Sequence, residues 1–327
     1  MSRGVAFVAL VAACVLGAGG YVAWAATRTD DVGRTADAAS LRALERRPYV
    51  VFLSSAKGVA PFDRLSVAPL DDPAKRLEVG LRCDRVATVA SLGSCVEHDV
   101  GLGVTYHVTF FDRAFRPVAR GYGAGIPSRT RLSPSGRFAA VTSFSQGDSY
   151  LHAGEFSTTT AVFRTATGKA VVSSLEQLHV LRDGKRFEPL DRNFWGITFV
   201  DDRRFYATMG TGETTYLVLG DLAMRTLRTV HENVECPSLA PDGRRIGFKR
   251  RDAHGAWRFT VLDVATLRET PLAERRSVDD QLAWAGDDRV AYGWQGAVWT
   301  ERADGAGKPT LLLDDAQSPT FVYPSLT

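Results

Sequence analysis

The sequence predicts an all-β fold, a six-bladed β-propeller that is closed by its C-terminal strand and preceded by an N-terminal apolar helix. Two observations predict it. A unit of turns and short strands recurs along the chain in six copies, at a spacing of roughly 40–55 residues that is typical of four-stranded propeller blades. The chain also ends in a strand-like stretch, residues 318–323, that no further unit follows. Because one unit cannot bury its own apolar faces, its copies must stack on one another.

The first half of the unit is a polar turn followed by a short apolar strand. It is clearest at residues 239–248, where Pro-Asp-Gly-Arg leads into Ile-Gly-Phe, and residues 132–141 match it closely. Looser copies occur at 199–206 and 284–292, and a weaker one at 84–87. Asp-Gly, Ser-Gly and Asp-Asp place turn-forming residues where the chain must reverse. The β-branched and aromatic residues that follow are typical of half-buried strands.

The second half of the unit is a strand, a turn and a returning strand. We find it at residues 64–69, 107–120, 161–168, 216–230, 257–268 and 297–313. The earliest copy, which begins near Tyr49, has no turn-and-strand half before it. The C-terminal strand therefore completes the first blade, and this closure leaves only short, protected sheet edges.

These repeats resemble the WD40-like (PD40) repeats of TolB-type six-bladed β-propellers, most closely at 133–141 and 240–248. The resemblance covers about residues 47–327 and is nearest to the secreted or membrane-anchored TolB-like translocation proteins of actinobacteria. It implies a propeller with a binding role and demonstrates no activity. TolB itself has an additional N-terminal α/β domain. Only about 20 residues separate the apolar N-terminus from the first blade here, so we expect that domain to be absent.

The first 26 residues are predicted to be a signal anchor or a signal peptide. The apolar run from Gly4 to Ala26 is long enough to span a bilayer, and it also contains an Ala-Trp-Ala cleavage-type triplet at 23–25. Both alternatives place the propeller outside the cytoplasm, with membrane contact through residues 4–26 in the anchored form. Residues 27–46 are predicted to be a polar tether with a short helix near 39–46.

Charge and cysteine content narrow the class of protein further. The formal net charge is +3, and basic residues alternate with acidic ones, so we expect no nucleic-acid partner. Cys83 and Cys95 flank an apparent hairpin, and we expect them to form a disulfide, which an extracytoplasmic location permits. Cys236 is then a buried thiol. A pairing of Cys236 with Cys83 or Cys95 stays open until the ring geometry is known.

The sequence contains no recognisable catalytic or metal motif. None of the six histidines stands in a His-x-Glu or His-Glu-x-x-His arrangement, and Gly-x-Ser-x-Gly is absent. The Gly-rich stretches lack nucleotide-binding spacing. We therefore expect neither a metal nor a cofactor. We interpret Trp257, Trp284, Trp294 and Trp299 as packing residues.

One set of polar residues suggests a binding site. In a propeller, the loop that enters each innermost strand lies at one mouth of the central channel, where convergent polar groups can bind a ligand. The residues that we expect at this mouth are Arg129, Arg131, Arg192, Asn193, Trp195, Glu235, Asp279, Asp280 and Gln281. In the alternative interpretation, these groups only satisfy one another and the ends of the inner strands, with Trp195 packed between blades.

These observations favour a monomeric, non-catalytic binding or scaffold module of the cell envelope. It would present its channel mouth to a protein, a peptide, an envelope component or a polar ligand. The alternative is a propeller enzyme, a hydrolase or lyase whose catalytic residues come from several blades, because such sites leave no local motif. A third hypothesis is a regulatory ectodomain that senses envelope conditions.

Overall fold

The computed structural model describes residues 36–55, 60–101, 103–150 and 156–324. The described residues all belong to one compact unit, Arg34–Thr327. The predicted signal segment, residues 1–26, lies outside the described residues. Within the part that the structure describes, no helix is long and apolar enough to cross a membrane.

A short helix precedes the first strand. Helix α2 (Ala38–Leu44) lies where the sequence predicts a helix near the end of the tether. The Asp37 side chain caps it by accepting a hydrogen bond of 2.7 Å from the Ser40 amide. Leu44 at its end is buried in the same apolar cluster as Tyr49 and Val51, so the helix packs on the first sheet.

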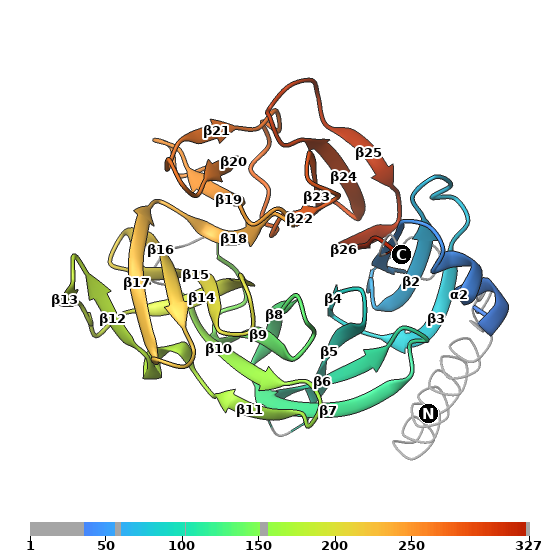
Figure 1. Ribbon diagram of the computed structural model, residues 1–327, viewed down its shortest axis with the longest axis horizontal. Helices are drawn as coiled ribbons and strands as arrows, with labels where there is room; N and C mark the ends of the chain where they lie inside the picture. The colour runs from blue at the N-terminus through green and yellow to red at the C-terminus, as the bar shows by residue number, and fades with distance from the viewer. Residues whose placement is uncertain (1–35, 56–59, 102, 151–155, 325–327) are drawn as a thin grey trace, which may run out of the picture. The chain divides into compact units, whose positions relative to one another are not determined.

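Six sheets are arranged around a central axis, as Figure 1 shows. The first sheet has the strand order β26-β1-β2-β3. These strands are, in that order, Ala316–Val322, Tyr49–Ser54, Arg64–Pro69 and Leu77–Arg82. The second contains β4 to β7, which are Arg85–Thr88, Leu92–Val100, Val104–Asp112 and Pro117–Ala124. The third contains β8 to β11, which are Ile126–Leu132, Phe138–Gln146, Ser157–Arg164 and Lys169–Val172.

The remaining sheets follow in chain order. The fourth contains β14 to β17, which are Asn193–Phe199, Arg204–Thr211, Thr214–Asp221 and Thr226–Glu232. The fifth contains β18 to β21, which are Glu235–Leu239, Arg245–Arg251, Trp257–Asp263 and Glu269–Pro271. The sixth contains β22 to β25, which are Ala283–Trp284, Arg289–Trp294, Ala297–Arg302 and Thr310–Leu313. The predicted six-bladed propeller is confirmed.

The fourth sheet departs from the four-stranded pattern. After the 3-10 turn η2 (Leu175–Gln177), the chain forms β12 (His179–Arg182) and β13 (Lys185–Arg186) before it enters β14. Strand β12 pairs in parallel with the outer strand β17, so this sheet has six strands. The repeat pattern contained no signal for this addition, because its strands lie outside the repeating unit.

The two ends of the described chain meet in the first sheet. Strand β26 pairs antiparallel with β1, with Tyr49 opposite Val322 and Val51 opposite Thr320. A buried cluster that includes Phe52 and Leu313 also joins this sheet to the sixth. The first sheet therefore draws its innermost strand from the end of the sequence, where the unpaired strand-like stretch predicted it.

The hydrophobic core is distributed between neighbouring sheets. Between the third and fourth sheets, for example, Val162 packs in one cluster with Phe194 and Phe205, and all three are fully buried or nearly so. Burying one such side chain contributes about 1.5–3 kcal/mol. Clusters of the same kind join each of the remaining five pairs of neighbouring sheets. The blades are therefore held by their stacking, as the size of the repeat requires.

The cysteines and tryptophans also have clear positions. Cys83 and Cys95 form a disulfide, with Cα atoms 5.3 Å apart. Cys236 is a free, fully buried thiol in β18. Trp257 and Trp284 are buried between strands, and the Trp284 indole donates a hydrogen bond of 2.8 Å to the Ser238 carbonyl.

Candidate functional site

The structure divides the predicted mouth residues between two cavities. The first, which we call the channel pocket, has a volume of about 150 Å³ and is lined by residues that include Arg85, Arg129, Arg131, Asp279, Asp280, Gln281 and Gln317. The second, which we call the groove, has a volume of about 820 Å³ and is lined by residues that include Arg192, Asn193, Trp195, Glu213, Glu235 and Arg251. The sequence predicted one ring, whereas the structure forms two adjoining sets.

Bulges in the inner strands determine where these side chains point. The register of β8 shifts between Pro127 and Arg129, and β14 and β18 contain shifts at the corresponding places. Gly196 and Cys236, which lie within the bulges of β14 and β18, both have positive φ angles. A bulge inserts an unpaired residue and redirects the side chains beside it. The inner strands can therefore turn polar groups toward the channel while their ends stay paired.

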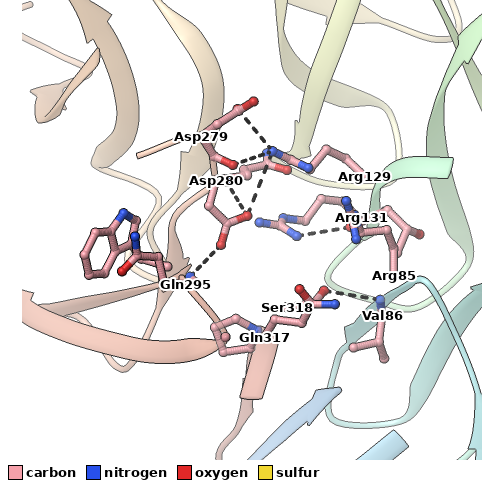
Figure 2. Close-up of a pocket in the computed structure, with 15 residues that line it drawn as sticks. Arg85, Val86, Arg129, Arg131, Asp279, Asp280, Gln295, Gln317 and Ser318 are labelled. Carbon is pink, nitrogen blue, oxygen red and sulfur yellow. Dashed lines mark hydrogen bonds and ion pairs between the residues drawn. The ribbon is translucent and has the colours of Figure 1, made fainter. Parts of the chain in front are cut away.

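Three arginines enter the channel pocket from one side (Figure 2). Arg129 and Arg131 are two residues apart on β8, a spacing that places both side chains on the same face of a strand. Arg131 donates a hydrogen bond of 3.1 Å to the Leu282 carbonyl. Arg85 donates to the carbonyls of Ser128, at 2.5 Å, and Asp84, at 2.7 Å. Backbone carbonyls thus fix the directions of these guanidinium groups.

Two aspartates lie opposite the arginines (Figure 2). The Asp280 carboxylate accepts hydrogen bonds from the backbone amides of Gln281, at 2.8 Å, and Gly293, at 2.7 Å. Asp279 forms an ion pair of 2.6 Å with the Lys249 ammonium. Arg129 lies 3.6 Å from Asp279 and 3.9 Å from Asp280, so it is only loosely paired with either.

The charges around Asp279 change its acidity. Burial alone acts to raise the pKa of this carboxyl, but the Lys249 ammonium and the Arg129 guanidinium outweigh burial and hold the pKa below its ordinary value. Asp279 is therefore a carboxylate at neutral pH. It neutralises a lysine that the channel pocket itself does not expose.

Lys249 is fully buried behind the pocket wall. Its ammonium lies 3.9 Å from the centre of the Trp257 ring and 5.2 Å from that of Tyr150. Cation–π contacts of this kind stabilise a desolvated cation by about 2 kcal/mol. The neighbouring Glu235 accepts hydrogen bonds from the Trp257 indole, at 3.0 Å, and from Arg251, at 2.7 Å.

Tyr150 lies between the two cavities. Its hydroxyl is 2.7 Å from that of Ser128 on the channel side, and the Arg129 guanidinium lies 5.5 Å from its ring. On the groove side its ring stacks on Trp195, with centroids 5.8 Å apart, and meets Phe156 edge-on. Tyr150 therefore forms a partition that belongs to neither lining.

Several predicted residues in the groove already form hydrogen bonds or packing contacts within the protein. The Asn193 side-chain oxygen accepts hydrogen bonds from the Thr158 amide, at 3.0 Å, and hydroxyl, at 2.8 Å. Arg192 donates to the carbonyls of Pro189 and Glu176, both at 3.0 Å. Trp195 is buried in an aromatic cluster. For these residues the structure favours the interpretation that they satisfy one another and the strand ends.

The sequence reasoning missed Arg85, Lys249, Tyr150 and Gln317. Arg85 had a weak signal, because it stands in the weakest copy of the repeat, residues 84–87. The prediction of a turn and second strand there is wrong: Arg85 begins the inner strand β4, whereas Arg129 lies within the inner strand β8. The signal for Lys249 was weak: it directly follows the apolar stretch 246–248 of β19, and the structure buries it with that stretch. Among the described residues, no group of three or more histidine, cysteine or acidic side chains is placed to hold a metal ion.

Comparisons with known proteins identify the fold. No family model and no curated protein matches the chain. Among solved structures, TolB from Acinetobacter baumannii is similar with a TM-score of 0.58 and 14% identity, over 86% of this chain and 68% of that one. A puromycin-hydrolyzing peptidase of Mycobacterium tuberculosis matches with a TM-score of 0.49 and 16% identity, over 82% of this chain and 45% of the peptidase.

A putative TolB from Agrobacterium tumefaciens matches with a TM-score of 0.41 and 11% identity, over 83% of this chain and 91% of that one. Identities this low show the fold alone, and only the likeness to the Acinetobacter protein is close enough to carry that argument. The resemblance predicted from the repeats is confirmed at this level: the chain has the fold of a TolB-like six-bladed β-propeller.

Proposed function

We propose that this chain is a non-catalytic binding propeller of the cell envelope, which holds a polypeptide partner at the face that carries the channel pocket and the groove. One observation carries the proposal. Both cavities are lined by the loops that enter innermost strands, at 279–281 and 190–193, and by turns between second and third strands, at 293–296 and 210–215. These segments lie at the same end of their sheets, so the cavities share one face.

The groove suits a polypeptide in size and chemistry. Its volume of about 820 Å³ is within the usual range for ligand cavities, roughly 300–1,000 Å³. The exposed Leu190 and the half-buried Phe156 offer apolar contacts, while Glu213 and Arg251 offer charges of both signs. A peptide presents this same mixture of apolar and polar groups.

The proposal assigns no chemical step to the site. Neither cavity is lined by a histidine among the described residues, and the acidic groups of the channel pocket are held by amides and by Lys249. The alternative is a propeller hydrolase or lyase with residues from several blades. A stoichiometric metal ion in the purified protein would favour that alternative.

We further propose that residues 1–26 direct the propeller to the outer side of the cytoplasmic membrane. The apolar run and its cleavage-type triplet support this location. N-terminal sequencing of the mature protein tests it. A sequence that starts near residue 26 indicates secretion, a start at Met1 in the membrane fraction indicates an anchor, and a cytoplasmic protein contradicts the proposal.

The binding face is tested by site-specific photocrosslinking in the native cell envelope. A photoreactive residue replaces the exposed Leu190 in the groove, and a matched control replaces the exposed Met224 in the turn between β16 and β17, at the opposite end of the same blade. A polypeptide that crosslinks at position 190 and not at 224 supports the proposal. Equal crosslinking at both positions contradicts it.

The charge-bearing variant Leu190→Arg extends the test to affinity. Because Leu190 is fully exposed, the substitution should leave the unfolding midpoint unchanged while weakening capture of the crosslinked partner at least about tenfold. Met224→Arg is the control and should capture the partner as the wild type does. Normal capture by a folded Leu190→Arg variant would show that the groove is not the binding face.

A further inference from the structure

We propose that the channel pocket is a binding site for a single carboxylate group. The inference rests on the proposed function, since it names the chemistry that this end of the binding face recognises. Its central observation is an excess of positive charge that the described protein does not neutralise. Arg85, Arg129 and Arg131 line the pocket against only Asp279 and Asp280.

The two aspartates are already committed. Asp279 is paired with Lys249 at 2.6 Å, and both oxygens of Asp280 accept backbone amides. Among the residues that the structure describes, Arg129 is their only guanidinium partner, at 3.6 and 3.9 Å. Arg85 and Arg131 donate to backbone carbonyls and form no ion pair there. The pocket thus retains at least one uncompensated positive charge.

The pocket also contains a donor without an acceptor. Arg129 is only 8% exposed, and its Nε–H has no hydrogen-bond partner in the described structure. A buried polar group left unpaired costs about 1–3 kcal/mol, and more when it is charged. An oxyanion in the pocket would accept this donor and the free N–H groups of its neighbours. Figure 2 shows Arg129 pointing toward Asp279 and Asp280, with Arg131 and Arg85 on the same side of the pocket.

Two of the three arginines have pKa values below their ordinary value, which is consistent with a missing anion. Burial acts to lower the pKa of Arg129 as well, but acidic groups that include Asp280 outweigh burial and raise that pKa. Burial, together with the positive charge of Arg129, lowers the pKa of Arg131 to about 10, although Asp280 acts in the opposite direction. Burial and the same neighbour also lower the pKa of Arg85. Bringing like charges together in a desolvated site is costly. A bound anion offsets this repulsion.

The size and charge of the pocket select a carboxylate over a phosphate. A volume of about 150 Å³ admits a small group and excludes a whole peptide segment. Three arginines line the pocket with two aspartates, so the lining has an excess of one positive charge, which a monoanion neutralises and a dianion overcompensates. A planar carboxylate also matches the fork of a guanidinium group, with two parallel hydrogen bonds.

The experiment measures the binding of acetate to the purified propeller by calorimetry at constant ionic strength. We expect saturable binding to the wild type, and we expect Arg131→Gln to weaken it about tenfold, because one charge-assisted contact is lost. Arg131→Lys, which keeps the charge but lacks the fork, should fall between the two. Arg228→Gln, at an exposed position on the outer strand β17, is the matched control and should bind as the wild type does.

The unfolding midpoint of each variant is measured as a control for folding. If Arg131→Gln does not fold, Arg85→Gln is the second variant that tests the site. Absence of saturable acetate binding to the wild type overturns the inference. Acetate affinities of folded Arg131→Gln and Arg85→Gln that both equal that of the wild type also overturn it. Binding of inorganic phosphate but not acetate also overturns it. Because acetate needs no partner, this result is independent of the crosslinking at position 190, so failure of either proposal is recognisable by itself.

Two peptides then separate the sources of the carboxylate. One ends in a free C-terminal carboxylate and has no acidic side chain, and the other is amidated and carries one internal aspartate. Binding of either, weakened by Arg131→Gln, supports the site and identifies the source. Failure of both peptides to bind a propeller that binds acetate would overturn the link between the pocket and a polypeptide ligand.

Discussion

The ammonium group of Lys249 lies 2.6 Å from the Asp279 carboxylate and is completely shielded from solvent. The two residues come from different blades, since Lys249 stands on β19 and Asp279 precedes β22. The pair therefore ties the fifth blade to the loop that enters the sixth. Because its charge is offset by Lys249, Asp279 contributes less to neutralising the channel arginines. One ion pair therefore affects both the stability of the ring and the charge of the pocket.

We expect Asp279→Asn to destabilise the protein by about 3–5 kcal/mol, because it leaves a buried ammonium without its partner. Urea unfolding followed by tryptophan fluorescence measures the change. The double variant Asp279→Asn/Lys249→Met should recover much of the loss, since the buried charge is then gone as well.

The matched control for this pair is Asp304→Asn. Its ion pair with Arg302 lies at the surface, where solvent screens it, so its loss should shift the unfolding midpoint far less than Asp279→Asn does. If Asp279→Asn proved as mild as Asp304→Asn, the buried pair would not have the structural role assigned to it.

The disulfide between Cys83 and Cys95 should contribute about 3 kcal/mol. The cysteines are 12 residues apart, and a loop of that length restricts the unfolded chain by about this amount. We expect the double variant Cys83→Ala/Cys95→Ala to unfold at a correspondingly lower urea concentration. Reductant should lower the midpoint of the wild type and leave that of the variant unchanged. If reductant left the urea midpoint of the wild type unchanged, the Cys83–Cys95 pairing would be contradicted.

The stability of the sixth blade should fall as the pH rises from about 5 to 8. Burial raises the pKa of Glu301 to about 7, and the negative charge of Glu274 adds to this, against the backbone amides that donate to Glu301. The unfolded chain releases this proton near pH 4.5, so in the window between the two values the folded protein binds more protons. The stabilisation is complete below about pH 4.5 and is lost as the pH passes 7.

Thermal unfolding at several pH values tests this dependence. Glu301→Gln should flatten the decline, because the amide cannot ionise. Glu274 does not titrate in this window: although burial acts to raise its pKa, hydrogen bonds from Arg276 and Tyr292 hold it at about 2. Parallel curves for the wild type and Glu301→Gln would refute the assignment.

Gly196 should not tolerate a side chain. Its φ is +64°, and a Cβ atom there would lie 2.5 Å from the Cα atom of Cys236 in the neighbouring inner strand. We expect Gly196→Ala to cost at least about 1–3 kcal/mol in unfolding free energy, from backbone strain and the clash together. Gly101→Ala is the control, because the space around Gly101 is open and its φ is ordinary. Equal midpoints for the two variants would rule out close packing of the inner strands at this bulge.

Much of the fold was predictable because its signals are local. The Pro-Asp-Gly turn at 241–243 and the Ser-Pro-Ser-Gly turn at 133–136 each precede a strand that the structure contains, β19 and β9. Turn geometry depends on a few adjacent residues, and stacking follows from the size of the repeat. The strand-like stretch at 318–323 has no further unit after it, which predicted that it pairs with the first blade. In the structure β26 pairs with β1.

The site was only partly predictable. Arg129, Arg131, Asp279, Asp280 and Gln281 line one pocket as a group, because loops in equivalent blade positions converge on the channel. The other predicted residues belong to the groove, where Asn193 is bonded to Thr158 and Arg192 to the carbonyls of Pro189 and Glu176. No repeat pattern distinguishes these outcomes.

The sequence alone therefore determined the blade number, the strand order within the repeats and the approximate mouth of the channel, since these depend on turn chemistry and on the period of the apolar pattern. Only the tertiary structure decided that Lys249 meets Asp279, that Tyr150 divides two cavities and that Arg85 joins the arginines of β8. Those contacts join residues 22 to 46 positions apart, and they depend on the bulges and angles at which separate sheets meet around the axis.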